Sequence, residues 1–360
     1  MLHRGSTHRL VFLIVIVVIV IVAHLAAETH ASSGDRSWDY IQCCQPCFSD
    51  CARQSDKPSS LSVLDSLNPL RWTCMDECRY NCMHACTEAH VAAGQPVQQF
   101  HGKWPFTRFA GMQEPASVLF SILNGMAHIY GARRYAQAIP EQYAFRRLWI
   151  GYAVVNVNTW FWSAIYHTRD LFWTERLDYW FATASILCSM FCGLVRISNV
   201  LHRFRWLVMA LMMAVFGAHV IYLSQDRFDY GYNMTASVAV FAANAMLWVL
   251  WCAFAPVHPL LPVVEPRPLQ IDPQRAIDGG SYPPIPSLAY RRKALAAVVG
   301  LGLCAAFEIA DFPPVFGIFD AHALWHGSTV LVIVVWYSFL IDDASYELHL
   351  ARSRSAKQLR

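Results

Sequence analysis

The sequence predicts an all-α membrane protein, in which a seven-transmembrane helix bundle follows a small disulfide-rich N-terminal domain. Three observations lead to this fold class. The 360-residue chain is 56% hydrophobic and only 15% charged, whereas a soluble domain carries about 25% charged residues. Seven apolar runs have the length of membrane-spanning helices. Eight of the twelve cysteines lie between Cys43 and Cys86, close to the N-terminus.

Residues 1–31 are predicted to be a signal peptide. Arg4 and Arg9 provide the positive start, and an unbroken apolar core of 13 residues runs from Leu10 to Val22. Small residues follow, so that cleavage is expected after Ala27 or Ala31. The alternative is an uncleaved anchor, but the core is shorter than the roughly 20 residues of a spanning helix. The chain is therefore expected to enter the secretory pathway.

Residues 32–114 are predicted to form a cysteine-rich lumenal domain. In the second half of this segment one cysteine recurs per helical turn, which places four of them on one helix face. Two short helices joined by disulfides would satisfy the pattern, and an oxidising lumen favours disulfides over a competing zinc cluster. Eight cysteines allow 105 pairings, so the connectivity stays open. The two clusters are Cys43, Cys44, Cys47, Cys51 and Cys74, Cys78, Cys82, Cys86.

Residues 115–341 are predicted to be the membrane core. Each run has enough apolar length to cross about 30 Å of hydrocarbon, although the first and third are short. The proline-rich segment 257–293 is interpreted as a cytosolic loop within this core, and residues 342–360 as a cytosolic tail. The predicted spans are 115–132, 148–166, 179–195, 206–223, 234–256, 294–310 and 322–341.

The distribution of basic residues predicts the orientation. With the cysteine-rich domain in the lumen, sixteen Arg and Lys residues fall in the cytosolic loops and tail, against three in the lumenal loops between spans. This bias agrees with the positive-inside rule. The net charge of only +3, without a basic run interleaved with aromatic residues, argues against nucleic-acid binding.

Five reactive side chains from three predicted spans fall at one depth, near the lumenal surface. Ser163 and His167 share a helix face at the end of the second span, Asp178 begins the third, and His322 and His326 begin the seventh, again on one face. Ionisable residues within spans are costly, which makes them candidates for function. Trp160, Trp162 and Trp325 lie among them, as in an interfacial aromatic belt.

Three histidines are the ligand set of a catalytic zinc that keeps one position for water. Zinc lowers the pKa of that water to about 7. Asp178 would act as general base and then as general acid, and Ser163 would assist the water or the developing oxyanion. Ser163 as the nucleophile is an open alternative, as is the interpretation of the histidines as merely packed residues. His128, His219, Glu308 and Asp311 are interpreted as structural, with Asp311, Asp320 and Asp229 as further groups that could support the ligands.

Several stretches resemble one known family. The pattern Ser163-x3-His167-x10-Asp178, followed by His322-x3-His326, is similar to the signature of the CREST membrane hydrolases, which include the alkaline ceramidases and the progestin and adipoQ receptors. More specific stretches resemble the Per-one-like family of post-GPI-attachment factors, over residues 40–345. These are His101-Gly-Lys-Trp-Pro-Phe106, Arg108-Phe-Ala-Gly-Met-Gln-Glu-Pro-Ala-Ser-Val118, Phe120-Ser121, Asn124, Asn158-Thr-Trp-Phe-Trp-Ser163, His167-Thr-Arg-Asp170, Thr174-Glu-Arg-Leu-Asp-Tyr179, Asp229-Tyr-Gly-Tyr-Asn-Met234 and Ala321-His-Ala-Leu-Trp-His326.

The resemblance implies remodelling of the lipid of glycosylphosphatidylinositol (GPI) anchors. Members remove the sn-2 acyl chain of the phosphatidylinositol part, a phospholipase A2-type ester hydrolysis in the endoplasmic reticulum or Golgi. It implies Zn²⁺ on His167, His322 and His326, with Asp178 and Ser163 as catalytic groups. GPI-anchored proteins and membrane lipids would be the partners, and residues 103–106 and 113–115 would contact the headgroup or form a lid. The alternatives are a ceramidase-like amidase, a zinc-containing receptor and a non-catalytic export factor.

Overall fold

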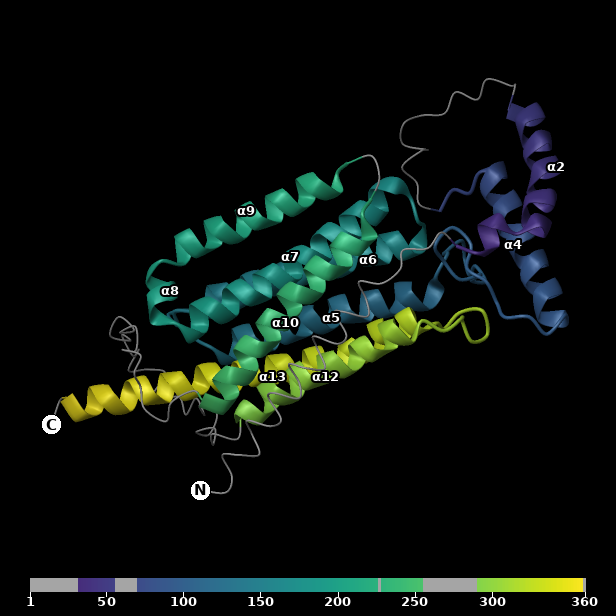
Figure 1. The fold of residues 1–360 in the computed structure, drawn as a ribbon. Helices are drawn as coiled ribbons and strands as arrows, with labels where there is room; N and C mark the ends of the chain where they lie inside the picture. Colours follow the sequence, from purple (N-terminus) through teal and green to yellow (C-terminus); the bar gives the residue numbers. More distant parts are fainter. Residues whose placement is uncertain (1–31, 56–69, 226–227, 255–289, 359–360) are drawn as a thin grey trace.

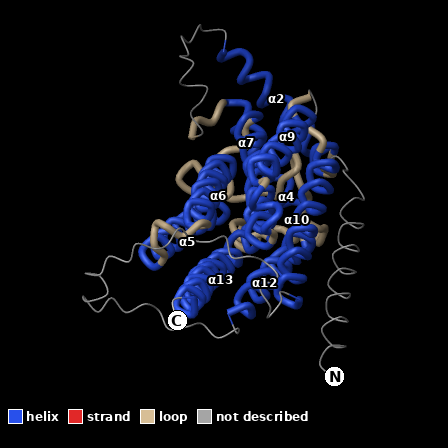
Figure 2. The backbone as a smooth tube through the Cα atoms, turned by 90° about the vertical axis from the view of Figure 1, so that its left-hand side faces the viewer, coloured by secondary structure: helices blue, strands red, loops and turns tan. Residues whose placement is uncertain are grey.

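The computed structural model describes residues 32–55, 70–225, 228–254 and 290–358, and these residues form helices joined by turns and loops (Figure 1). The predicted signal peptide and most of the predicted proline-rich loop lie outside the described residues. The helical content agrees with the all-α fold class. Figure 1 shows two parts, a small helix pair (α2 and α4) and a large bundle, and Figure 2 shows that helices dominate the described residues.

The small part is an antiparallel helix pair held by disulfides. After the short 3₁₀ helix η1 (Gly34–Arg36), α2 (Trp38–Ser55) lies against α4 (Cys74–Ala92). Helical spacing brings one cysteine of α2 opposite one of α4 at successive turns, which confirms the prediction of two disulfide-joined helices. The bridges are Cys43–Cys82, Cys47–Cys78 and Cys51–Cys74.

Two cysteines of the clusters remain thiols for a geometric reason. Cys86 continues the row on α4, but Asp39 and Tyr40 stand one turn before Cys43 in α2, where a fourth partner would be needed. Cys44 is displaced from the bridged face because it directly follows Cys43. Both thiols are buried, in the hydrophobic cluster that includes Tyr40. The competing zinc cluster is not supported, since the cysteines that could hold an ion here are bridged.

Among the described residues, seven long helices make up the bundle. Six of them form a closed ring, in which each helix packs on the next in the order α5, α6, α7, α10, α12, α13 and back to α5, while α9 lies outside against α7 (Figure 1). Their bounds are α5 (Pro115–Ala138), α6 (Arg146–Thr168), α7 (Phe172–Ile197), α9 (Arg205–Leu223), α10 (Tyr230–Phe254), α12 (Arg291–Ala310) and α13 (Ala321–Gln358), with the short α8 (Asn199–Arg203) before α9.

Aromatic side chains fill the middle of the ring. Trp248 lies with its ring centroid 5.0 Å from that of Trp336 and 5.6 Å from that of Phe339, and Trp149 lies 6.2 Å from Trp336. Edge-on contacts of this kind add to the energy of burial. Gly131 lets α5 approach α13, because a Cβ there would stand 2.2 Å from the ring of Tyr337. This core fixes how the helices that carry the predicted site are placed.

Five helices are long and apolar enough to cross a membrane: α7, α9, α10, α12 and α13. These correspond to five of the seven predicted spans. Helices α5 and α6 have 24 and 23 residues, but they carry more polar and basic side chains and do not reach the same hydropathy. Helix α7 begins at Phe172, before the predicted start at residue 179. Helix α13 continues to Gln358, through the segment predicted as a tail.

Candidate metal centre

The three predicted ligand histidines come together at the end of the bundle that faces α2 and α4 (Figure 1). His167 lies in the last turn of α6, and His322 and His326 lie on one face of the first turns of α13. Their nitrogens are mutually within 4.8 Å. The segment before α5 ties these helix ends together, since Glu114 N–H donates to the carbonyl of His167 at 3.0 Å.

Each histidine is held through its Nδ1 atom. Glu114 Oε2 lies 2.7 Å from Nδ1 of His167 and Glu308 Oε2 lies 2.7 Å from Nδ1 of His322. The hydroxyl of Ser121 lies 3.0 Å from Nδ1 of His326. Partners of this kind orient metal-binding imidazoles and make them more basic. All three rings therefore present Nε2 to a common point.

The arrangement of the Nε2 atoms fits a metal ion. Those of His322 and His326 are 3.0 Å apart, and ligands at about 2.0–2.1 Å from one zinc are separated by little more than this. Nε2 of His167 is buried and has no hydrogen-bond partner among the described residues. A buried polar atom without a partner is costly, and a metal would satisfy it. His167 and His326 are each 2% exposed, whereas the side chain of His322 is 32% exposed, so the centre is reached from the side of His322.

The other two predicted site residues lie beside the histidines. The hydroxyl of buried Ser163 is 3.1 Å from that of Ser121. Asp178 lies close enough to Ser163, His167 and His322 to interact with all three. All five predicted residues therefore occupy one place, although they come from three helices. A carboxylate, a hydroxyl and three imidazoles in this arrangement are suited to hydrolysis of an ester or amide.

A buried lysine supports the ligand shell from the side of the loop before α5. Lys103 forms an ion pair with Glu114 and lies 3.6 Å from Asp170 Oδ2. Its ammonium also lies 4.1 Å from the ring centroid of Tyr166. Burial alone would raise the pKa of Glu114, but Lys103 and His167 lower it well below its usual range. Glu114 is thus an anion on which the position of His167 depends.

Sequence reasoning missed the three residues behind the histidines. Glu308 was interpreted as structural, which is incomplete: it accepts the Nδ1 hydrogen bond of His322. The position of Glu308 in an apolar helix could have indicated a role in the site, because carboxylates within membrane spans are rare and usually functional. Glu114 stood in a stretch predicted to meet the headgroup or form a lid, and Ser121 had no predicted role. Of the proposed supporting groups, Asp311 accepts from Trp104 and Asp229 accepts from Tyr222. Asp320 caps α13 and interacts electrostatically with His322.

His128 and His219 lie outside the centre, as predicted. His128 contacts the hydroxyl of Tyr337 at 3.2 Å, and His219 contacts that of Thr183 at 3.1 Å. Two of the tryptophans predicted as interfacial pack against the centre. The ring centroid of Trp160 lies 5.1 Å from that of His326, and that of Trp325 lies 4.9 Å from it.

Comparison with known proteins agrees with the sequence resemblance. Residues 66–344 match the Per1-like family, and this segment includes every residue of the centre. The chain belongs to the Per1-like family. The GPI-specific phospholipase A2-like PGAP3 of Xenopus tropicalis is 37% identical to this Per1-like chain over 340 residues, covering 92% of this chain and 96% of the relative.

Two further relatives show the same full-length similarity. The GPI-specific phospholipase A2-like PGAP3 of Homo sapiens is 36% identical over 338 residues, which cover 91% of this Per1-like chain and 94% of the relative. The post-GPI attachment to proteins factor 3 of Drosophila melanogaster is 35% identical over 329 residues, covering 88% and 90%. No solved structure matches the chain.

Proposed function

We propose that this protein remodels GPI anchors by hydrolysing the sn-2 acyl ester of their phosphatidylinositol part. The observation that carries the proposal is the convergence of three Nε2 atoms beside Asp178 and Ser163. The names of its relatives, GPI-specific phospholipase A2-like PGAP3, supply the substrate. Similarity along nearly the whole chain makes transfer of that function reasonable.

His167, His322 and His326 would hold a zinc ion. Zinc bound by three histidines supplies a Lewis acid and a water of lowered pKa. Asp178 would take the proton of the attacking water and return it to the leaving glycerol oxygen. Ser163 would donate to the oxygen that becomes negative as the ester carbonyl is attacked. Trp160 and Trp325 would keep bulk water from the reacting ester.

The site also suits the place of the substrate in a membrane. We assign all seven long helices as spans, because α5 and α6 also expose apolar side chains such as Leu119, Met126 and Phe161. We assign the disulfide-bonded helices to the lumen of the endoplasmic reticulum or Golgi. Disulfides form in such oxidising compartments. The centre lies at the same end of the bundle as the disulfides (Figure 1). It would then face the lumenal leaflet, near the depth of an sn-2 ester.

The test follows the sn-2 chain of GPI-anchored proteins by mass spectrometry, in cells that lack the endogenous activity. Wild type and His326→Ala are expressed at matched levels. His219→Ala is the matched control, because His219 is also a buried histidine of the bundle but lies outside the centre. Metal analysis of the purified proteins accompanies the assay.

Wild type and His219→Ala should remove the unsaturated chain and contain about one zinc per protein. His326→Ala should do neither. If wild type leaves the chain in place, the proposed hydrolysis is wrong, and a ceramide amide becomes the substrate to test. If His326→Ala remains fully active, the reaction stands but the assignment of the site does not.

A further inference from the structure

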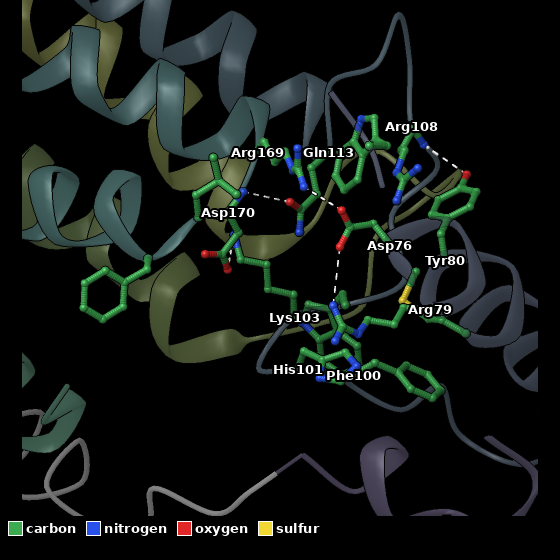
Figure 3. A pocket seen from close by; sticks show the side chains of 15 residues that line it. Asp76, Arg79, Tyr80, Phe100, His101, Lys103, Arg108, Gln113, Arg169 and Asp170 are labelled. Carbon is green, nitrogen blue, oxygen red and sulfur yellow. Dashed lines mark hydrogen bonds and ion pairs between the residues drawn. The ribbon is translucent and has the colours of Figure 1, made fainter. Parts of the chain in front are cut away.

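A cavity of 510 Å³ lies between the disulfide-bonded helices and the bundle. Three segments enclose it: the start of α4, the loop that leads to α5, and the turn between α6 and α7 (Figure 3). Its volume falls in the range of about 300–1,000 Å³ typical of small-molecule sites. The proposed reaction uses none of the α4 residues that line the cavity. The presence of these residues at the cavity therefore requires a separate explanation.

The cavity is lined by more cations than anions. Lys103, Arg79, Arg108 and Arg169 face Asp76 and Asp170, together with aromatic side chains (Figure 3). Two of the arginines share one carboxylate, since Asp76 lies 2.6 Å from Arg169 and 3.4 Å from Arg79. Arg108 pairs with Glu77 at 2.6 Å and Lys103 pairs with Glu114, and neither of these carboxylates lines the cavity. The side chains at the cavity surface are therefore mostly cationic, with two of the partner carboxylates outside the lining, which favours an anionic ligand.

Two of the arginines, Arg108 and Arg169, are held against aromatic rings in a way that suits binding of a phosphate. The guanidinium carbon of Arg108 lies 3.3 Å from the ring centroid of Trp72 and 4.1 Å from that of Tyr80. That of Arg169 lies 4.7 Å from the centroid of Trp72. Nε of Arg108 is buried and has no hydrogen-bond partner among the described residues. A guanidinium fixed on aromatic rings keeps its donors oriented, which lowers the entropy cost of binding.

The cavity adjoins the metal centre through a direct chain of contacts. Lys103 lines the cavity and pairs with Glu114, and Glu114 holds His167. Arg169 stands two residues after His167, at the end of α6. A molecule in the cavity would therefore lie beside the point at which the ester is attacked.

We infer that this cavity binds the phosphate-linked inositol–glycan headgroup of the substrate while its acyl ester lies at the metal centre. This inference rests on the proposed function. The arginines would bind the phosphate. Asp170 and Gln113 offer oxygens and amide protons to hydroxyl groups, and the aromatic side chains offer faces to sugar C–H groups. A choline or ethanolamine phospholipid has no sugar that could contact the α4 residues of the cavity. The cavity would therefore bind the GPI lipid in preference to these phospholipids.

Binding of an acyl-free headgroup tests the inference separately from hydrolysis. The full-length protein, purified in detergent, is titrated by calorimetry with glycerophosphoinositol-glucosamine, which contains no ester to cleave. Glycerophosphocholine and inorganic phosphate are the comparison ligands. Arg79→Gln removes a half-exposed cation that lies i+3 from Asp76. Its matched control is Arg53→Gln on α2, which removes an exposed arginine that lies i+3 from Asp50 and outside the cavity.

Wild type should bind the glycan headgroup at least about tenfold more tightly than either comparison ligand. Arg79→Gln should weaken this binding about tenfold, as expected for loss of one charged hydrogen bond, and Arg53→Gln should change it less than about twofold. Arg108→Lys, which keeps the charge but loses the planar stacking, should also weaken it about tenfold.

Three results would overturn the inference: no binding of the headgroup, equal binding of inorganic phosphate, or equal affinity of Arg79→Gln and Arg53→Gln. The two proposals fail in different ways. If the protein removes the acyl chain in cells but does not bind the purified headgroup, the proposed hydrolysis stands and the proposed role of the cavity is wrong. If the protein binds the headgroup but does not remove the acyl chain, the proposed hydrolysis is wrong and the cavity remains a recognition site for the headgroup.

Discussion

Glu114 holds the Nδ1 atom of His167 at 2.7 Å, although 53 residues separate them in the sequence. The same carboxylate pairs with Lys103, so the ligand histidine is connected to the loop that leads from the disulfide-bonded helices. Glu114 is only 4% exposed. An ion pair in this position does more than stabilise the fold, because it sets the direction in which a metal ligand points.

Glu114→Gln should therefore weaken zinc binding about 10- to 100-fold, since the amide keeps the shape of the side chain and loses its charge. Competition with a fluorescent chelator measures the affinity. Asp229→Asn is the control, because Asp229 pairs with Tyr222 away from the centre. Unchanged zinc affinity in Glu114→Gln would show that the hydrogen bond to His167 does not position the ligand.

Asp178 and Ser163 should differ in their effect on turnover. Asp178→Asn removes the proposed base and should reduce hydrolysis by up to about 10,000-fold. Ser163→Ala removes one donor and should reduce it about 100-fold. Both variants should retain zinc, because neither residue is a proposed ligand. Mass spectrometry of the released fatty acid gives the rates, and accumulation of an acyl-enzyme on Ser163 would instead establish the nucleophile alternative.

The bridge between Cys47 and Cys78 should stabilise the α2–α4 pair by about 2–4 kcal/mol. We expect the double substitution Cys47→Ser and Cys78→Ser to accelerate amide hydrogen exchange throughout both helices. Cys44→Ala is the control, since Cys44 is a free thiol in the same pair. Peptide mapping should recover all three bridges in that control, and faster exchange there would mean that packing rather than the disulfides holds the pair.

Gly131 and Gly151 should respond oppositely to alanine. A Cβ at Gly131 would overlap the ring of Tyr337, whereas a Cβ at Gly151 would meet no atom within 4 Å. Gly131→Ala should destabilise the bundle by about 1–3 kcal/mol, and Gly151→Ala should stabilise it by about 0.5–1 kcal/mol. The thermal unfolding midpoints of both variants in one detergent test this. Equal midpoints would argue against the close contact of α5 with α13.

Helix geometry made much of the candidate centre predictable. His322 and His326 stand four residues apart, as do Ser163 and His167, and an α-helix places such pairs on one face. Apolar run length likewise predicted helices close to those observed, because backbone hydrogen bonds must be satisfied within each segment in a membrane. The pattern of cysteines predicted two joined helices for the same reason of helical spacing.

The groups that hold the histidines depended on the tertiary structure. Glu308 reaches His322 from α12, and Ser121 reaches His326 from α5, across 205 residues of sequence. Such contacts depend on which helices are neighbours in the ring and how closely they pack, and neither follows from the periodicity of a single helix. The pairing of the cysteines was undetermined for the same reason, since it requires the register of α2 against α4. The cavity beside the centre likewise forms only where three separate segments meet.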